Sequence, residues 1–190
     1  MDFSLRIITL LLFALWQGYW WITEKKADRE KPKKHLKTKL SYVKRYGLHF
    51  IVYSIILLQV LGFPIFTFNF NSQVLGLVLV VVGISISISG RIVLGTNWAH
   101  AAEYQIKKGQ VLITNGIYRY IRNPIYTGLW FALTGAELVA KSYLFIIILF
   151  FGFWVAYSQA KREEKILEEY FGKEYLDYKK KSKMLIPFIF

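Results

Sequence analysis

The feature that most constrains this chain is a run of 45 consecutive residues, Tyr46–Gly90, that contains no Asp, Glu, Lys or Arg. A helix of a water-soluble domain needs a polar face, and a stretch of this length without a charge does not supply one. As a helix it would extend roughly 68 Å, about twice the ~30 Å hydrocarbon core of a bilayer. The run therefore predicts two membrane-spanning helices, separated at Pro64 and at the polar cluster 69–72.

The rest of the chain extends this interpretation to an all-α, polytopic membrane protein that forms a single domain over residues 1–190. A spanning helix needs about 20 mostly apolar residues. Five segments are predicted to supply one each: 5–22, 48–63, 74–94, 124–140 and 142–160. The charged segment that follows, 161–183, is predicted to form amphipathic helices.

The distribution of basic residues predicts the orientation of these helices. Of the 25 Lys and Arg residues, 23 lie in or at the edge of the segments 24–46, 91–123 and 161–190. Because basic residues concentrate on the cytoplasmic side, we expect a multi-pass protein of the cell membrane with its N-terminus outside and its C-terminus in the cytoplasm. An active site is then expected on the cytoplasmic side, in the connector 95–123 or in the tail after residue 160.

Composition excludes several kinds of function. A net charge of +13 suits a nucleic-acid-binding protein, but a chain that is 55% apolar and 19% charged is too apolar for that class. The chain contains no cysteine, which excludes disulfides and thiolate metal sites. His35, His49 and His100 are scattered, so we predict no metal. We expect membrane lipids as neighbours, with the basic stretch 25–45 either a topology signal or an anionic-lipid patch, and no obligatory protein partner.

The connector before the fourth predicted span contains a candidate ligand site. Residues 110–114 are apolar and β-branched, which favours an extended segment that ends at an Asn115-Gly116 turn. Asn123-Pro124 then opens a helix, since asparagine is a strong N-cap and proline suits the first helical position. The N–H groups of that helix end suit an anionic ligand group. The alternative is a loop that only caps a helix.

The tail contains a glutamate on an apolar stripe. Leu167, Tyr170 and Phe171 lie four, seven and eight residues after Glu163, which places this carboxylate on the apolar face of a helix. The same spacing directs Glu164 elsewhere. A carboxylate on such a face needs a partner to offset its desolvation. Glu163 is expected either to pair with a basic residue beneath it or extend to the membrane edge, or to hold a cationic group of a bound ligand.

Two motifs in these segments resemble the signatures of isoprenylcysteine carboxyl methyltransferase-like membrane enzymes. The first is Gly116-x-Tyr118-x3-Arg122-Asn123-Pro124-x-Tyr126-x-Gly128, and the second is Glu163-Glu164-x2-Leu167-x3-Phe171-Gly172-x2-Tyr175-x2-Tyr178. They occur in the family's order, and the resemblance covers roughly the C-terminal half of the chain. In size and in its five spans the chain is similar to the small prokaryotic members.

The resemblance implies transfer of a methyl group from S-adenosylmethionine, with S-adenosylhomocysteine as product, in a cytoplasmic pocket between the connector after the third span and the C-terminal helix. Carried over by spacing, the cofactor-binding residues are Glu103 (Gln105 by residue type), Gln110, Val111, Leu112, Ile113, Tyr118, Asn123, Pro124, Ile125, Tyr126 and Glu163. The backbone of 111–113 is expected to meet the polar edge of adenine, with Tyr118 enclosing the ring. Glu163 is expected to take the ammonium group.

The expected acceptor is the carboxylate of a lipophilic small molecule or lipid-modified group, similar to isoprenylcysteine. A carboxylate is already ionised at neutral pH, so catalysis rests on positioning and on exclusion of water. Family members place an arginine one turn before the tail glutamate, where this chain has Gln159, and usually a histidine where it has Asn123. We predict that Arg91 positions the acceptor as the catalytic residue; the alternative is an arginine that snorkels to the membrane interface.

Three alternative functions remain at this stage. A phospholipid amine N-methyltransferase would also use S-adenosylmethionine, but would need a base to remove a proton. A sterol-reductase-like oxidoreductase that binds NADPH is the second, since those enzymes share an R-H-P-x-Y segment. The third is a non-enzymatic scaffold on the lipid surface, favoured only by the basic stretch.

Overall fold

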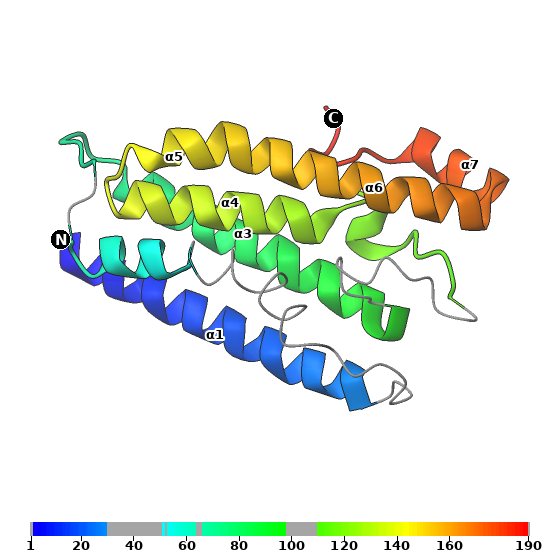
Figure 1. Cartoon of the computed structure of the whole chain (residues 1–190), viewed down its shortest axis with the longest axis horizontal. Coiled ribbons are helices and arrows are strands. Elements are labelled where there is room, and N and C mark those ends of the chain that lie inside the picture. The colour runs from blue at the N-terminus through cyan, green and yellow to red at the C-terminus, as the bar shows by residue number, and fades with distance from the viewer. Residues whose placement is uncertain (1, 30–50, 52, 64–65, 98–109, 190) are drawn as a thin grey trace. The chain divides into compact units, whose positions relative to one another are not determined.

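The structure, a computed structural model of the chain, describes residues 2–29, 51, 53–63, 66–97 and 110–189. Within these ranges the regular structure is helical, apart from two isolated β-bridges (Figure 1). The helices are α1 (Asp2–Arg29), α3 (Gln73–Leu94), α4 (Pro124–Val139), α5 (Leu144–Ile147), α6 (Phe153–Phe171) and α7 (Lys173–Lys181). Shorter turns are the 3-10 helices η1 (Gly95–Asn97) and η2 (Gly116–Arg119) and the π-helical turn η3 (Ile148–Gly152), which joins α5 to α6. The all-α prediction is confirmed for the described residues.

Three described helices are long and apolar enough to cross a membrane: Phe3–Thr23 within α1, Gln73–Leu94, and the continuous helix Leu144–Phe171. They contain the first and third predicted spans and all but the first two residues of the fifth. Large apolar side chains on these helices are exposed, such as Leu15 (71%) and Phe150 (70%). The chain is therefore an integral membrane protein.

The other two predicted spans are shorter in the structure. Residues 51 and 53–60 are helical, while part of the predicted span 48–63 lies outside the described residues. α4 begins and ends within one residue of the predicted 124–140, but its 16 residues are fewer than a full crossing needs. Five crossings therefore stay a prediction.

The chain divides into two compact units, Met1–Val78 with Gly135–Phe145, and Leu79–Thr134 with Ile146–Phe190. In the first unit a polar network holds the end of α4. The buried carboxylate of Glu137 accepts a hydrogen bond of 3.1 Å from Gln59 Nε2, which also donates to Ser142 Oγ at 2.7 Å. Ser72 Oγ donates to the carbonyl of Leu138 at 2.7 Å. The buried carboxylate of Glu137 and the carbonyl of Leu138 are thus hydrogen-bonded within the unit.

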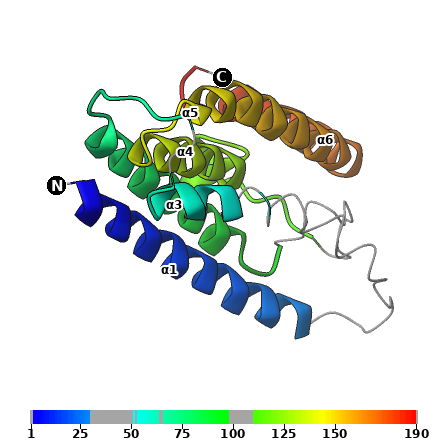
Figure 2. The ribbon, with the colours of Figure 1, turned by 60° about the vertical axis from the view of Figure 1, so that its left-hand side comes forward.

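In the second unit, α3 and α4 lie side by side because small residues line their contact (Figures 1 and 2). A Cβ on Gly83 would lie 2.5 Å from the carbonyl oxygen of Gly128, and a Cβ on Gly128 would collide with the carbonyl of Gly83. Glycine at both positions lets the two backbones approach, as is common between membrane helices. The same contact places the start of α4 beside the C-terminal part of α3, where a Cβ on Gly90 would meet Pro124 at 2.9 Å.

α6 is attached to α4 through a tryptophan. Trp130 Nε1 donates a hydrogen bond of 3.0 Å to the carbonyl of Leu149 in the π-helical turn, and the Trp130 and Phe153 rings lie 5.1 Å apart. The wider turn of a π-helix leaves carbonyls available to such donors. α6 then extends beyond the apolar part of the helix into the charged tail.

The tail folds back on itself after α6. Gly172 separates α6 from α7 with φ of +55°, a left-handed conformation that favours glycine. After α7 the chain runs back along α6, where Leu185 packs, fully buried, with Ala156 and Ala160 (Figure 1). On its way it pairs with the segment that precedes α4: the backbone N–H of Arg122 donates to the carbonyl of Lys183 at 2.8 Å.

Candidate functional site

A buried ion pair connects the segment before α4 to the tail. Arg122 Nε lies 2.7 Å from Glu164 Oε1, with side-chain exposures of 8% and 4%. The Arg122 guanidinium also donates to the backbone carbonyls of Lys179 (3.3 Å) and Ser182. One arginine thus holds α6 and the residues that end α7.

Asn123 completes this clamp, by which we mean the contacts among Arg122, Asn123 and Glu164. Its side-chain amide donates to Glu164 Oε1 at 3.1 Å and to the carbonyl of Met184 at 3.3 Å. α4 begins at Pro124 as the sequence predicts, but the amide of Asn123 is directed to the tail. A buried carboxylate needs several donors to offset its desolvation, and Arg122 and Asn123 provide them.

Sequence reasoning missed the clamp. It directed Glu164 away from the apolar face that carries Glu163 and gave it no partner, whereas the structure buries Glu164 to 3% exposure. Its partner Arg122 is 42 positions away along the chain, so helical periodicity carries no signal for the pair. The signal that could have indicated this pair is that Arg122 belongs to the first motif and Glu164 to the second.

A narrow cleft lies beside the clamp, between the connector and the tail helices. The connector contributes Gln110, Val111, Leu112, Ile113 and Tyr118, and the tail contributes Leu167, Phe171, Tyr175 and Tyr178; Leu94, Asn97 and Arg122 complete the lining. Its walls are therefore mostly aromatic and aliphatic. A planar apolar ring with a few polar edges is the kind of group that such a lining accommodates.

Two tyrosines fix the shape of this cleft. The hydroxyl of Tyr178 donates a hydrogen bond of 2.7 Å to the backbone carbonyl of Tyr118, and the Tyr175 and Tyr178 rings meet edge to face at 5.8 Å. Burial raises the pKa of Tyr178 and of Tyr175 above the ordinary value of a phenol. Both hydroxyls therefore stay protonated near neutral pH, and Tyr178 keeps its role as donor.

A second carboxylate, Glu163, lies within electrostatic reach of Tyr118 in the lining of the cleft. The hydroxyl of Tyr126 in α4 donates a hydrogen bond of 2.5 Å to Glu163 Oε1 in α6, and both side chains are half-buried. Burial raises the pKa of Tyr118; the Glu163 carboxylate raises it further and the Arg91 guanidinium lowers it. Glu163 and Arg91 are therefore within electrostatic reach of the same phenol.

Arg91 is buried near the C-terminal end of α3. Its exposed fraction is 5%, and Nη1 donates a hydrogen bond of 3.0 Å to the carbonyl of Gly95 in η1. The connector segment 110–113 is hydrogen-bonded to the same turn η1, since the backbone N–H of Val111 donates to Asn97 Oδ1 at 3.2 Å. A cation at this position can orient a carboxylate through charge-assisted hydrogen bonds.

The structure thus brings together most of the residues singled out from the sequence. Gln110–Ile113 and Tyr118 line the cleft, and Tyr126 is hydrogen-bonded to Glu163, whose charge acts on Tyr118. Pro124 and Ile125 instead face Gly90 of α3 and are not among the residues that line the cleft. Glu103, Gln105 and the three histidines lie outside the described residues.

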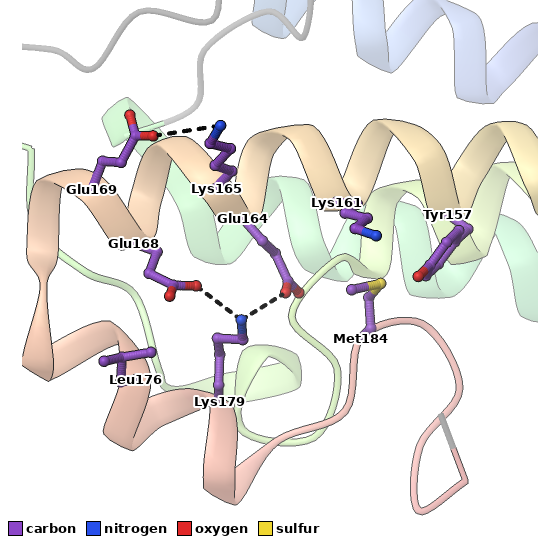
Figure 3. A pocket seen from close by; sticks show the side chains of 9 residues that line it. All are labelled: Tyr157, Lys161, Glu164, Lys165, Glu168, Glu169, Leu176, Lys179 and Met184. Carbon is purple, nitrogen blue, oxygen red and sulfur yellow. Dashed lines mark hydrogen bonds and ion pairs between the residues drawn. The ribbon is translucent and has the colours of Figure 1, made fainter.

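A larger cavity, of about 620 Å³, lies on another face of α6 (Figure 3). It is lined by side chains of α6, α7 and the returning C-terminal segment, and it shares no lining residue with the cleft. Lysines and glutamates dominate its walls, in contrast to the aromatic walls of the cleft. Despite its smaller volume, the cleft is the candidate active site, because aromatic side chains line it and because the charges of Glu163 and Arg91 both act on Tyr118 of that lining.

Comparison with known proteins assigns this architecture to methyltransferases. Residues 71–174 match the family model described as phospholipid methyltransferase. The chain is 28% identical to protein-S-isoprenylcysteine O-methyltransferase of Dictyostelium discoideum over 98% of this chain and 77% of the relative. It is 34% identical to the Saccharomyces cerevisiae enzyme of the same name, over 50% of this chain and 40% of the relative.

A solved structure has the same fold. The eukaryotic intramembrane Ras methyltransferase, an isoprenylcysteine carboxyl methyltransferase, superposes with a TM-score of 0.69 at 18% identity, over 99% of this chain and 68% of that one. The chain spans less than half of the yeast relative's length and about three quarters of the Dictyostelium relative's. The matched residues 71–174 include the first motif, α4 and all of α6.

Proposed function

The chain belongs to the phospholipid methyltransferase family, and from this premise we propose that it transfers a methyl group from S-adenosylmethionine to the carboxylate of a lipophilic, isoprenylcysteine-like acceptor. The observation that carries the proposal is the cleft, where an aromatic wall, Glu163 and Arg91 converge. The names of the two relatives support a carboxyl acceptor. They also favour a methyltransferase over the oxidoreductase and scaffold alternatives.

The chemistry of the cleft fits the proposed cofactor. S-adenosylmethionine, when bound, supplies a methyl group on a positively charged sulfur, together with an adenine ring and an amino-acid end. Leu112, Ile113 and Tyr118 would enclose the ring, and the polar backbone of 111–113 would meet its edge. Glu163, held by Tyr126, would take the ammonium group.

The chain's own residues then act by binding and orientation. A carboxylate acceptor needs no general base at neutral pH, because it is already ionised. Arg91 would hold it by charge-assisted hydrogen bonds near the rim of the cleft. Aromatic and aliphatic walls exclude water, which strengthens these electrostatic contacts and favours an in-line approach.

We place this site at the cytoplasmic face of the membrane. The proposal keeps the five crossings of the sequence prediction within a single domain, with the N-terminus outside and the C-terminus in the cytoplasm. It is supported by the 23 basic residues in or beside three of the connecting segments. A lipophilic acceptor would then reach the cleft from the inner leaflet.

A second candidate, methylation of a phospholipid amine, is favoured by the description of the matching family. An amine must lose its proton before it can attack, so this reaction needs a base and its rate rises with pH as the ammonium is deprotonated. A carboxylate acceptor shows no such rise between pH 6.5 and 8.5. The pH dependence of the rate therefore separates the two acceptor classes.

The test is methyl transfer by the purified, detergent-solubilised chain. With radiolabelled S-adenosylmethionine we expect label in an S-prenylated cysteine acceptor, released by mild base as a methyl ester is, and none in phosphatidylethanolamine. Arg91→Lys, which keeps the charge but removes the planar fork, should lower kcat and leave the affinity for S-adenosylhomocysteine unchanged.

Two results would overturn the proposal. Base-stable label in phosphatidylethanolamine would assign the amine reaction. Absence of S-adenosylhomocysteine binding in calorimetry, with binding of NADPH instead, would remove methyl transfer altogether.

A further inference from the structure

The larger cavity on α6 has a chemistry of its own. Its lysines are Lys161, Lys165 and Lys179, and they are not equivalent. Lys179 Nζ lies 2.9 Å from Glu168 and 4.0 Å from Glu164, and Lys165 Nζ lies 4.0 Å from Glu169. Among the described residues that line the cavity, Lys161 is the lysine whose charge is not in such an ion pair.

Lys161 lies over an aromatic ring. Its Nζ is 5.8 Å from the centroid of Tyr157, one turn earlier on α6, and the side chains of Lys161, Tyr157 and Met184 converge at one end of the cavity (Figure 3). A cation over a ring keeps its hydrogen-bond donors for another partner. The carboxylate of Glu164 is already bonded to Arg122, so this end of the cavity carries an excess of positive charge.

The position of this end along α6 indicates where its ligand comes from. Phe150 (70%), Phe151 (58%) and Trp154 (58%) are exposed on the preceding turns of the same candidate spanning helix. The phenylalanines are apolar, whereas tryptophan is enriched at the boundary between the hydrocarbon core and the headgroups, so Trp154 marks that boundary. Lys161 follows Trp154 by seven residues, about 10 Å along the helix, so the surface changes from apolar through aromatic to cationic.

The lining of the larger cavity shows the same change from apolar to cationic. Tyr157 and Met184 pack against the buried cluster of Ala156, Ala160 and Leu185, which gives the cavity an apolar floor beneath Lys161. Methionine side chains adapt well to flexible apolar ligands. An amphiphile whose acyl chains lie along the exposed aromatic turns would place its phosphate at Lys161.

We propose that this cavity binds the phosphate group of a membrane glycerophospholipid, with Lys161 as its cationic contact and Tyr157 and Met184 against the glycerol and upper acyl region. The site is separate from the cleft, with which it shares no lining residue. It is a lipid-binding site at the membrane boundary and is independent of the methyl acceptor.

The proposal is tested by lipid binding to the purified full chain in a neutral detergent, with titration of phosphatidylglycerol followed by native mass spectrometry. We expect Lys161→Gln to weaken binding about tenfold, since it removes one charge-assisted contact to the phosphate. The matched control is Arg162→Gln. Arg162 is an exposed cation one residue further along α6 that does not line the cavity, and its replacement should leave the affinity unchanged.

Further probes separate the parts of the ligand. Diacylglycerol, which has the acyl chains without the phosphate, should bind at least tenfold more weakly than phosphatidylglycerol. Inorganic phosphate at millimolar concentration should not displace the lipid, because it lacks the apolar part. Thermal unfolding of both variants should match that of the unmodified chain, because both side chains are exposed.

Three outcomes would overturn the proposal. Equal weakening by Lys161→Gln and Arg162→Gln would show diffuse attraction to a basic surface. Equal binding of diacylglycerol would remove the phosphate from the recognition, and displacement of the lipid by inorganic phosphate would assign the site to the free ion. Because the readout is lipid binding, none of these results depends on methyl transfer.

Discussion

Glu163 and Glu164 are neighbours on α6, yet the structure gives them opposite surroundings. Glu164 is 3% exposed and is bonded by Arg122 Nε at 2.7 Å and by Asn123 Nδ2 at 3.1 Å. Glu163 is half-buried beside the cleft and accepts one hydrogen bond among the described residues, from Tyr126 at 2.5 Å. Two identical side chains one residue apart thus differ in how far their acceptor capacity is used by the protein.

A structural carboxylate differs from a ligand-binding one in how many of its acceptor positions the protein itself occupies. A carboxylate has about four acceptor positions. Those of Glu164 meet a guanidinium, an amide and, at 4.0 Å, Lys179, so its charge is offset within the fold. Glu163 keeps capacity for a cationic group at the edge of a cleft. We therefore propose that Glu164 stabilises the fold and that Glu163 binds ligand.

The largest effect is expected from Glu164→Ala. The substitution leaves the Arg122 guanidinium buried without its partner, which typically costs 3–5 kcal/mol of the free energy of unfolding. Thermal or denaturant unfolding in mixed micelles measures the loss. Glu169→Ala is the control, since Glu169 on the same helix is 67% exposed and only 4.0 Å from Lys165; its effect should stay below about 1 kcal/mol. Equal losses in the two variants would contradict a special role of the buried Glu164 in stability.

A smaller and more specific effect is expected from Glu163→Gln. The amide keeps the shape of the side chain and can still accept from Tyr126, but it carries no charge for an ammonium group. We expect the affinity for S-adenosylhomocysteine to fall about tenfold, equivalent to about 1.4 kcal/mol, with little change in the unfolding temperature.

Replacement of Glu163 should lower the ligand affinity more than the stability, and replacement of Glu164 should lower the stability more than the ligand affinity. Calorimetry with S-adenosylhomocysteine and thermal unfolding are measured on the same preparations of Glu163→Gln and Glu164→Gln. If Glu163→Gln binds as tightly as the unmodified chain, the carboxylate at the cleft has no part in ligand binding.

The same contrast shows what the sequence could predict. The uncharged run 46–90 and the helix signal Asn123-Pro124 are local features, and they placed the spanning helix 74–94 and the start of α4 within one residue. Glu163 was found because its partners on the apolar stripe follow at helical spacing. The proximity of the connector 110–113 to the tail came from the family resemblance rather than from periodicity.

What the sequence did not predict depends on pairing between distant segments. Arg122, Glu164 and Ser182 meet only because the chain turns at Gly172 and returns along α6. Residues 182–185 have no regular pattern, and their role lies in backbone carbonyls, which every residue has. The larger cavity was missed for the same reason, since its floor is Met184 on this returning segment.

The smallest effect is expected where the tail touches the connector through a neutral hydrogen bond, at Tyr178→Phe. The loss of the 2.7 Å bond to the carbonyl of Tyr118 should cost about 1 kcal/mol, whereas Tyr170→Phe, at a ring that is 50% exposed, should cost almost nothing.

Burial raises the pKa of Tyr178, so the folded chain keeps this proton above pH 10 while the unfolded chain loses it. Stability then falls as pH rises beyond about 10 and is flat from pH 6 to 9. The alkaline fall should be shallower in Tyr178→Phe, and an equally steep fall would show that this phenol is not buried against the connector.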